Sequence, residues 1–201
     1  MKHPENIKQI AALQPDYMGF IFYQKSSRYF NGTIPKLNKN IKKTGVFVNE
    51  TLAFVTKTIQ KHQLQAVQLH GKESPEYCEA LKPLGVEIIK VFSIKDTFNF
   101  KLLEPFETVC NYFLFDTKGK LPGGNGYTFN WDVLSQYPSS KPFFLSGGIG
   151  LDQVEAIKTF KKSKASKYCY ALDVNSAFEI EPGLKNNEQL KEFKDKLCAV
   201  N

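Results

Sequence analysis

The sequence lacks the features that mark membrane, disulfide-stabilised and metal-binding proteins. No apolar run reaches the roughly 18 residues that cross a membrane, and the first residues do not resemble a signal peptide. The four cysteines Cys78, Cys110, Cys169 and Cys198 stand far apart, with no CxxC pair and no histidine cluster beside them. We therefore expect a cytosolic (cytoplasmic) protein with free thiols, no metal and no membrane partner.

Arginine is nearly absent, because Arg28 is the only arginine among 27 lysine and arginine residues. The planar guanidinium group binds a carboxylate or phosphate through two hydrogen bonds, which lysine cannot do. The net charge of +7 comes from scattered lysines without an aromatic-rich basic stripe, so we expect no nucleic-acid partner. Arg28 is a candidate binding residue.

Seven short apolar runs recur along the chain. They are MGFIF (18–22), GVFV (45–48), AVQL (66–69), EIIKVF (87–92), YFLFD (112–116), PFFLS (142–146) and YALDV (170–174). The runs are nearly continuous and do not alternate between apolar and polar residues. This pattern predicts parallel strands that are buried on both faces.

Helical patterns lie between these runs. They cover residues 4–14, 35–42, 51–63, 74–84, 131–136, 151–160 and 187–199, and residues 93–111 hold at most a short helix. Alternating strands and helices predict a parallel α/β architecture, and no linker divides residues 1–201 into separate domains. A doubly wound open sheet accepts this count, but a (β/α)8 TIM barrel fits better if one strand precedes residue 4.

In such a barrel the active site lies at the C-terminal ends of the strands, often with a phosphate held by the last two loops. SGGIG follows one late strand, and the backbone N–H groups of Gly147 and Gly148 there can approach an anion. Asn175 and Ser176 follow the last strand. The pair of loops predicts a phosphate site, and an ordinary tight turn is the alternative for SGGIG.

Three other strand ends carry polar side chains. Asp116 closes an apolar strand, where it suits a general acid, although a loop-capping aspartate is the alternative. Residues 117–131 follow it as a glycine-containing candidate lid, with Gly124 as a candidate substrate contact. Arg28 lies just past the first strand. His70 ends another strand, and either a substrate contact or a role in orienting the loop is open.

Six blocks of the sequence, in this order and spacing, together resemble one family, phosphoribosylanthranilate isomerase of tryptophan biosynthesis. The blocks are GFIFYQKSSRYF, GVFVNE, AVQLHGKES, LFDTKGKLPGGNGYTFNW, LSGGIG and DVNSAFEIEPGLKN, and the match runs from residue 4 to 199. The resemblance implies a (β/α)8 barrel that catalyses an Amadori rearrangement without a cofactor. Its substrate is a small phosphorylated molecule, N-(5-phosphoribosyl)anthranilate, and its product is 1-(2-carboxyphenylamino)-1-deoxyribulose 5-phosphate.

The resemblance also implies roles for individual residues. Asp116 matches the general acid that protonates the furanose ring oxygen, and Arg28 matches the residue that pairs with the anthranilate carboxylate. The SGGIG and NSAFE loops match the phosphate cradle. The family commonly has Ser-Gly where this chain has Ser176 and Ala177, and an alanine fits there if the loop needs no positive φ.

The family's general base lies in a first strand that ends in Lys-x-Cys-Gly-Met, where the cysteine removes the proton from C2 of the sugar. Only Met1 corresponds here, so the base would lie two positions upstream. We expect that the recorded start is too late. None of the four cysteines is expected to substitute, since Cys110 and Cys169 precede or begin strands and Cys78 and Cys198 belong to outer helices.

Two other functions are weighed against this one. The chain as written could be a non-catalytic remnant that binds a phosphorylated ligand. Another phosphosugar barrel, such as an epimerase or indoleglycerol-phosphate synthase, would need a catalytic lysine or a metal-binding histidine pair at the strand ends, which the sequence does not show. The sequence predicts no oligomeric state.

Overall fold

The computed structural model describes residues 1–95, 97–117 and 131–199. One parallel sheet runs through them in sequence order. Its strands are β1 (Tyr17–Ile21), β2 (Lys42–Phe47), β3 (Ala66–Leu69), β4 (Glu87–Ile94), β5 (Tyr112–Thr117), β6 (Phe143–Ser146) and β7 (Cys169–Leu172). All seven apolar runs are confirmed as parallel strands, with shifts of a few residues at their ends.

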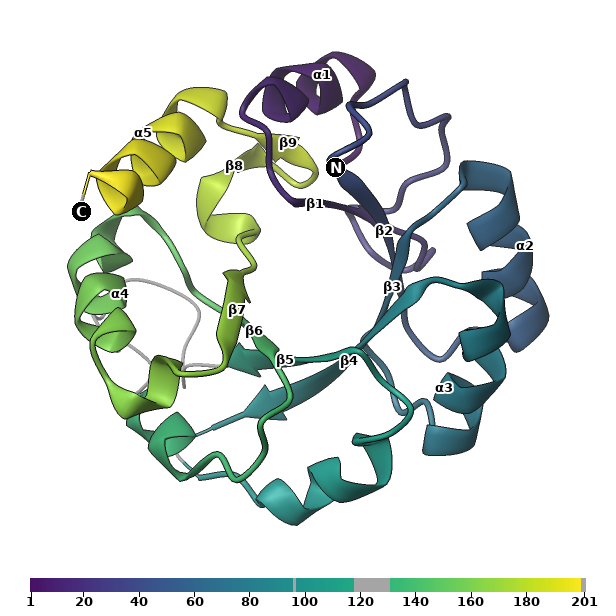
Figure 1. The fold of residues 1–201 in the computed structure, drawn as a ribbon. Helices are drawn as coiled ribbons and strands as arrows, with labels where there is room; N and C mark the ends of the chain where they lie inside the picture. Colours follow the sequence, from purple (N-terminus) through teal and green to yellow (C-terminus); the bar gives the residue numbers. More distant parts are fainter. Residues whose placement is uncertain (96, 118–130, 200–201) are drawn as a thin grey trace.

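Helices surround this sheet on its outer side (Figure 1). They are α1 (Pro4–Ala12), α2 (Leu52–His62), α3 (Pro75–Leu81), α4 (Val154–Lys161) and α5 (Asn187–Cys198). Short 3-10 turns cover Lys82–Leu84, Phe100–Phe106, Trp131–Gln136, Leu151–Gln153, Lys164–Ser166 and Ser176–Phe178, and a hairpin joins β8 (Glu179–Glu181) to β9 (Leu184–Lys185). Strands ringed by helices agree with the predicted TIM-barrel fold.

The helix starts follow from their capping residues. The Ser74 hydroxyl accepts a hydrogen bond from the backbone N–H of Tyr77 at 3.3 Å, ahead of an α3 that begins at a proline. The Thr51 hydroxyl caps α2 in the same way, by accepting from the N–H of Phe54 at 3.2 Å. Each cap satisfies a donor that the helix itself leaves unpaired.

The helix predicted for residues 35–42 is wrong. The chain there is irregular, and Lys42 already belongs to β2, where its N–H donates to the carbonyl of Asp16 at 2.9 Å. The Asn38 carboxamide accepts from the N–H of Asn40 at 3.1 Å, which closes a local turn. Asparagine side chains that bond their own backbone compete with helix formation, and Pro35 supplies no N–H donor.

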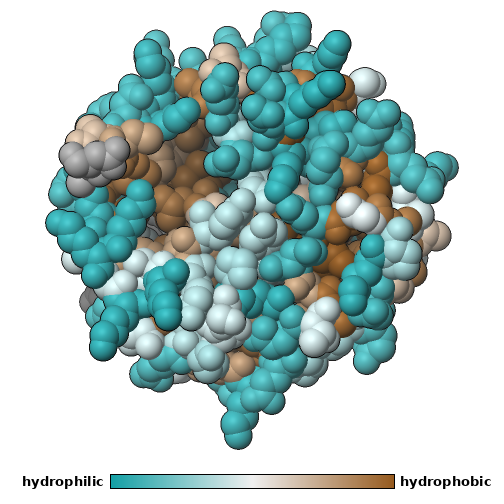
Figure 2. Space-filling model, viewed as in Figure 1, coloured by the Kyte–Doolittle hydropathy of each residue, from teal (hydrophilic) through white to brown (hydrophobic). Residues whose placement is uncertain are grey.

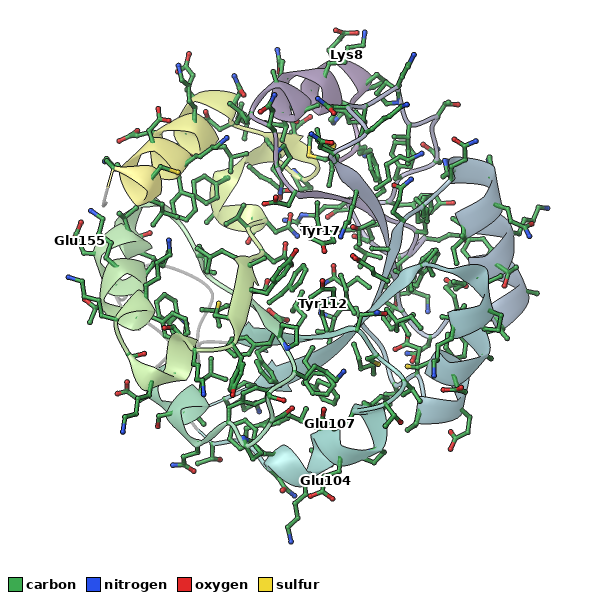
Figure 3. All side chains as sticks on the ribbon, viewed as in Figure 1. Lys8, Tyr17, Glu104, Glu107, Tyr112 and Glu155 are labelled. Atoms are coloured by element: carbon green, nitrogen blue, oxygen red, sulfur yellow. The ribbon has the colours of Figure 1, made fainter. Side chains whose placement is uncertain are left out.

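Side chains alternate across the sheet and divide the core into two clusters. Along β5, Phe113 and Phe115 belong to the large cluster packed against the helices, whereas Leu114 belongs to a smaller cluster on the other face. Tyr17 and Tyr112 pack against this smaller cluster, and Figure 3 shows both rings pointing to the centre of the barrel. The strands are therefore buried on both faces, as their apolar composition predicts.

The ring has an opening between β1 and β7, which are not paired with each other among the described strands. The backbone nitrogen of Met1 donates to the carbonyl of Gly19 at 2.7 Å, so the first residue lies against β1 at this opening. The strand that we expect ahead of residue 4 would precede the printed sequence, so it stays a prediction. In the described part of the chain, no helix is long and apolar enough to span a membrane.

Candidate active site

A cavity of about 920 Å³ extends along the opening between β1 and β7. It runs from the starts of these two strands to the C-terminal ends of β5, β6 and β7. Figure 2 shows a hollow lined by hydrophobic side chains inside α5, to which Leu190, Phe193 and Leu197 contribute. Six of the predicted site residues line this cavity: His70, Asp116, Gly147, Gly148, Asn175 and Ser176. Arg28 is not among the lining residues, and Gly124 and most of the candidate lid lie outside the described residues.

Asp116 and His70 both line the cavity and contact each other. The Nε2 atom of His70 lies 3.5 Å from Oδ2 of Asp116, and both side chains are partly buried. Asp116 comes from the end of β5, while the N–H of His70 extends the sheet beyond β3 by donating to the carbonyl of Phe47 at 2.8 Å. His70 therefore contacts the predicted acid rather than packing elsewhere.

The turn after β6 has a backbone that glycine accommodates best. Gly147 has a φ of +97° and Gly148 a φ of +66°, both in the left-handed region that other residues rarely adopt. A Cβ atom on Gly148 would meet no heavy atom within 4 Å, so the space beside its backbone is open. An anion in the cavity can thus approach this turn closely, just ahead of the helical residues 151–161.

The second loop lies against the first. A Cβ atom built on Gly150 would lie 3.2 Å from the Cβ of Ala177, so the loops after β6 and β7 approach each other there. Ala177 belongs to the 3-10 turn Ser176–Phe178 and is not among the residues with a positive φ. The alanine therefore fits at a position where the family commonly has glycine, and the two loops form one side of the cavity.

Arg28 is paired with a buried carboxylate that sequence reasoning missed. Its Nε and Nη2 atoms lie 2.7 and 2.6 Å from Oε2 of Glu179, while Oε1 of Glu179 accepts from Nζ of Lys185 at 2.9 Å. Burial alone would raise the pKa of Glu179, but the hydrogen bonds from Arg28 and Lys185 bring it down to about 2. Glu179 is thus ionised at neutral pH and holds both cations.

Lys185 connects Arg28 to the phosphate loop. Its Nζ atom donates to the carbonyl of Asn175 at 2.9 Å and to the Asn175 side chain, and the lysine also lines the cavity. Burial lowers the pKa of Lys185, although Glu179 opposes that change. The chain of contacts Arg28, Glu179, Lys185 and Asn175 therefore runs from the loop after β1 to the loop after β7.

Asp173 is a second carboxylate in the cavity and was also missed. It directly follows Leu172 at the end of β7, it is partly buried, and its Oδ2 atom accepts from the Ser146 hydroxyl at 3.2 Å. Burial raises the pKa of Asp173, although the hydrogen bond from Ser146 opposes that change. Asp173 stands near the end of the apolar run YALDV, as Asp116 stands at the end of YFLFD. The same strand-end argument that selected Asp116 therefore applies to Asp173.

The four cysteines lie where the sequence predicts. Cys78 is on α3, Cys198 ends α5, Cys110 precedes β5 and Cys169 begins β7, at the opposite end of that strand from the loop with Asn175. Burial raises the pKa of the Cys169 thiol to about 12, so it stays protonated at neutral pH. Within residues 1–95, 97–117 and 131–199, no three His, Cys, Asp or Glu side chains are grouped to hold a metal ion.

The chain is similar to known proteins over most of its length. A sequence model of the family described as N-(5'phosphoribosyl)anthranilate (PRA) isomerase matches residues 1–196. The N-(5'-phosphoribosyl)anthranilate isomerase of Parabacteroides distasonis is 39% identical over 96% of this chain and 88% of its own length. That of Phocaeicola vulgatus is 39% identical over 98% of this chain and 94% of its own.

The solved structure of phosphoribosyl anthranilate isomerase from Thermotoga maritima is also similar. It is 28% identical with a TM-score of 0.80, and the match covers 100% of this chain and 96% of that chain. Sequence and fold therefore agree over nearly the whole length of these proteins. The chain belongs to the N-(5'-phosphoribosyl)anthranilate isomerase family.

Proposed function

We propose that this protein catalyses the Amadori rearrangement of N-(5'-phosphoribosyl)anthranilate in tryptophan biosynthesis, with Asp116 as the general acid. The observation that carries the assignment is the cavity that joins Asp116 and His70 to the two loops at Gly147 and Asn175. An acid and an anion-binding surface on one cavity wall match a substrate whose reacting sugar carries a phosphate.

The reaction needs an acid and a base. Asp116 donates its proton to the furanose ring oxygen, the bond from that oxygen to C1 breaks, and the anthranilate nitrogen forms a protonated Schiff base with C1. A base then removes the proton from C2, which gives an enolamine that tautomerises to the ketone product. The family resemblance assigns this base to a cysteine ahead of Met1. Because the rearrangement is redox-neutral, proton transfers suffice for it.

The two ends of the substrate carry different anions. We assign the phosphate to the backbone N–H groups of Gly147 and Gly148 and to the loop at Asn175 and Ser176. Lys185 brings a positive charge to this loop by donating to the carbonyl of Asn175. We assign the anthranilate carboxylate to Arg28. A solved phosphoribosyl anthranilate isomerase, 25% identical to this chain, holds reduced 1-(o-carboxyphenylamino)-1-deoxyribulose 5-phosphate, which carries both anions. The proposal includes a cytoplasmic location, which rests on the biosynthetic role of the family.

Calorimetric titration tests the binding part of this proposal. The protein is titrated with reduced 1-(o-carboxyphenylamino)-1-deoxyribulose 5-phosphate, and ribose 5-phosphate serves as a ligand that lacks the anthranilate group. We expect the first compound to bind at least tenfold more tightly, because Arg28 adds a charge-assisted hydrogen bond to its carboxylate. Equal affinity for the two would indicate a general phosphosugar site and contradict the assignment.

A further inference from the structure

A fully buried ion pair lies behind the site and has no part in the proposed chemistry. Nζ of Lys90 is 2.9 Å from Oε2 of Glu73, and the two side chains are only 4% and 2% exposed. Lys90 is on the outer face of β4, where the neighbouring position Ile88 belongs to the apolar layer under the helices. Removing two charges from water is costly, and such a pair often adds little to stability. Its hydrogen bonds suggest another role.

Lys90 uses all three of its N–H donors on one loop. Besides Glu73, its Nζ atom donates to the carbonyl of Leu69 at 3.2 Å and to the carbonyl of Gly71 at 2.7 Å. These two carbonyls belong to the residues on either side of His70. The lysine therefore fixes the backbone directly before and directly after the histidine that contacts Asp116.

Glu73 ties the same loop to the loop that follows β2. Its carboxylate accepts from the N–H of Gly71 at 2.9 Å and from the N–H of Asn49 at 2.8 Å, and Asn49 follows β2. The Asn49 side chain in turn accepts from the N–H of Lys72 at 2.6 Å. A Cβ atom on Gly71 would come within 2.7 Å of the Asn49 nitrogen, so the two loops are packed without space for a side chain.

We infer that Glu73 and Lys90 are a positioning pair that holds the imidazole of His70 beside the carboxylate of Asp116. Neither residue lines the cavity that contains Asp116, so the pair acts through the loop. The catalytic part of this inference rests on the proposed function, which assigns the general acid to Asp116. The placement of His70 does not depend on that function and can be measured directly.

The test removes both charges together, because a single substitution would leave an unpaired buried charge and could prevent folding. The variant Glu73→Gln with Lys90→Met keeps similar volumes but removes the lysine donors to the carbonyls beside His70. The control is Lys42→Met with Glu87→Gln. It removes an ion pair of 2.5 Å between the first residues of β2 and β4, at the end of these strands that lies away from His70.

The structural readout is the ¹³C NMR spectrum of the histidine rings. The chain has three histidines, so each Cε1–H signal can be assigned by substitution. We expect the His70 signal to shift in the Glu73/Lys90 variant and the His62 signal to stay, while the Lys42/Glu87 control leaves both in place. An unchanged His70 signal in the folded variant would overturn the inference, whether or not the protein is an isomerase.

The kinetic readout is the isomerase assay of the chain with Lys-Val-Cys-Gly added before Met1. We expect kcat to fall about tenfold or more with KM little changed, since a misplacement of about 1 Å beside the reacting groups can cost up to about 10²-fold. Equal changes in kcat and KM together with a shifted His62 signal would indicate general damage and overturn a positioning role. If the double variant does not fold, Glu73→Asp keeps the charge but shortens the side chain by one methylene, and the same His70 shift is expected.

Discussion

His70 and Asp116 lie 3.5 Å apart although β4 separates their strands in the sheet. Asp116 pairs in register with Ser93 at the end of β4, and His70 extends past the shorter strand β3 to reach the same level. A histidine and a carboxylate in contact inside a cavity are a common arrangement for proton transfer. The other groups of the site can be tested around this pair.

The conformation of Gly148 predicts a selective loss of phosphate binding. Gly148→Ala places a side chain at a φ of +66°, which costs about 1 kcal/mol of folding stability and disturbs the open turn. Gly85→Ala is the matched control, because Gly85 has a φ of +68° and equally open space but lies outside the cavity. Calorimetry with inorganic phosphate should show weaker binding for Gly148→Ala alone. Equal phosphate affinity in both variants would argue against the cradle.

Arg28 should select the carboxylate end of the substrate. Arg28→Lys keeps a positive charge beside Glu179 but loses the planar fork that can hold two carboxylates at once. We expect about tenfold weaker binding of reduced 1-(o-carboxyphenylamino)-1-deoxyribulose 5-phosphate, the loss of one charge-assisted hydrogen bond. Ribose 5-phosphate, which has no such carboxylate, should bind as before. A parallel loss for both ligands would place Arg28 in a structural role only.

Glu179 makes the fold sensitive to acid. Its pKa is about 2 in the folded protein against 4.5 for an ordinary glutamate, so its stabilising effect is complete above about pH 4.5 and is lost as the pH falls toward 2. The shift corresponds to about 3 kcal/mol of the free energy of unfolding. Urea unfolding between pH 7 and pH 3 measures the part of it that is lost above pH 3, about 2 kcal/mol. Glu179→Gln should be less stable at pH 7 and should depend less on pH across this range.

Asp173 should have the opposite dependence. Burial raises its pKa in the folded protein, so protonation favours the folded state and the contribution of this group declines as the pH rises. Asp173→Asn keeps the shape without a charge to bury. Thermal unfolding at pH 8 should therefore show a Tm for Asp173→Asn at or above that of the parent protein. A clear drop in Tm would mean that the ionised carboxylate is stabilising.

Much of the fold could be predicted because buried parallel strands have an unmistakable composition. The runs from MGFIF to YALDV needed no tertiary information, and Ser74 and Thr51 mark their helix starts locally. The apolar spacing of segment 35–42 resembles that of a helix, but the Asn38 side chain accepts a hydrogen bond from the N–H of Asn40 and closes a turn instead.

The candidate site could be predicted only where a residue stands at a strand end. Asp116, His70 and the glycines of SGGIG have that signal, and they do meet in one cavity. Glu179 and Lys185 follow β7 at a distance, and nothing local shows that the β8–β9 hairpin returns Glu179 to Arg28 across 151 residues of sequence. The buried charge of Lys90 in EIIKVF was visible, but nothing local shows that its partners lie at the end of β3 and in the loop that follows it.

Turnover of N-(5'-phosphoribosyl)anthranilate, followed by chromatography of substrate and product, tests the central claim most directly. It is measured for the chain with Lys-Val-Cys-Gly added before Met1, for the chain without this addition, and for the extended chain with Asp116→Asn. An exposed aspartate on α5 gives the matched control, Asp195→Asn. We predict conversion by the extended chain and its control, and a rate lower by a factor of roughly 10² to 10⁴ where the cysteine or Asp116 is missing. Equal rates with and without Asp116 would contradict the account.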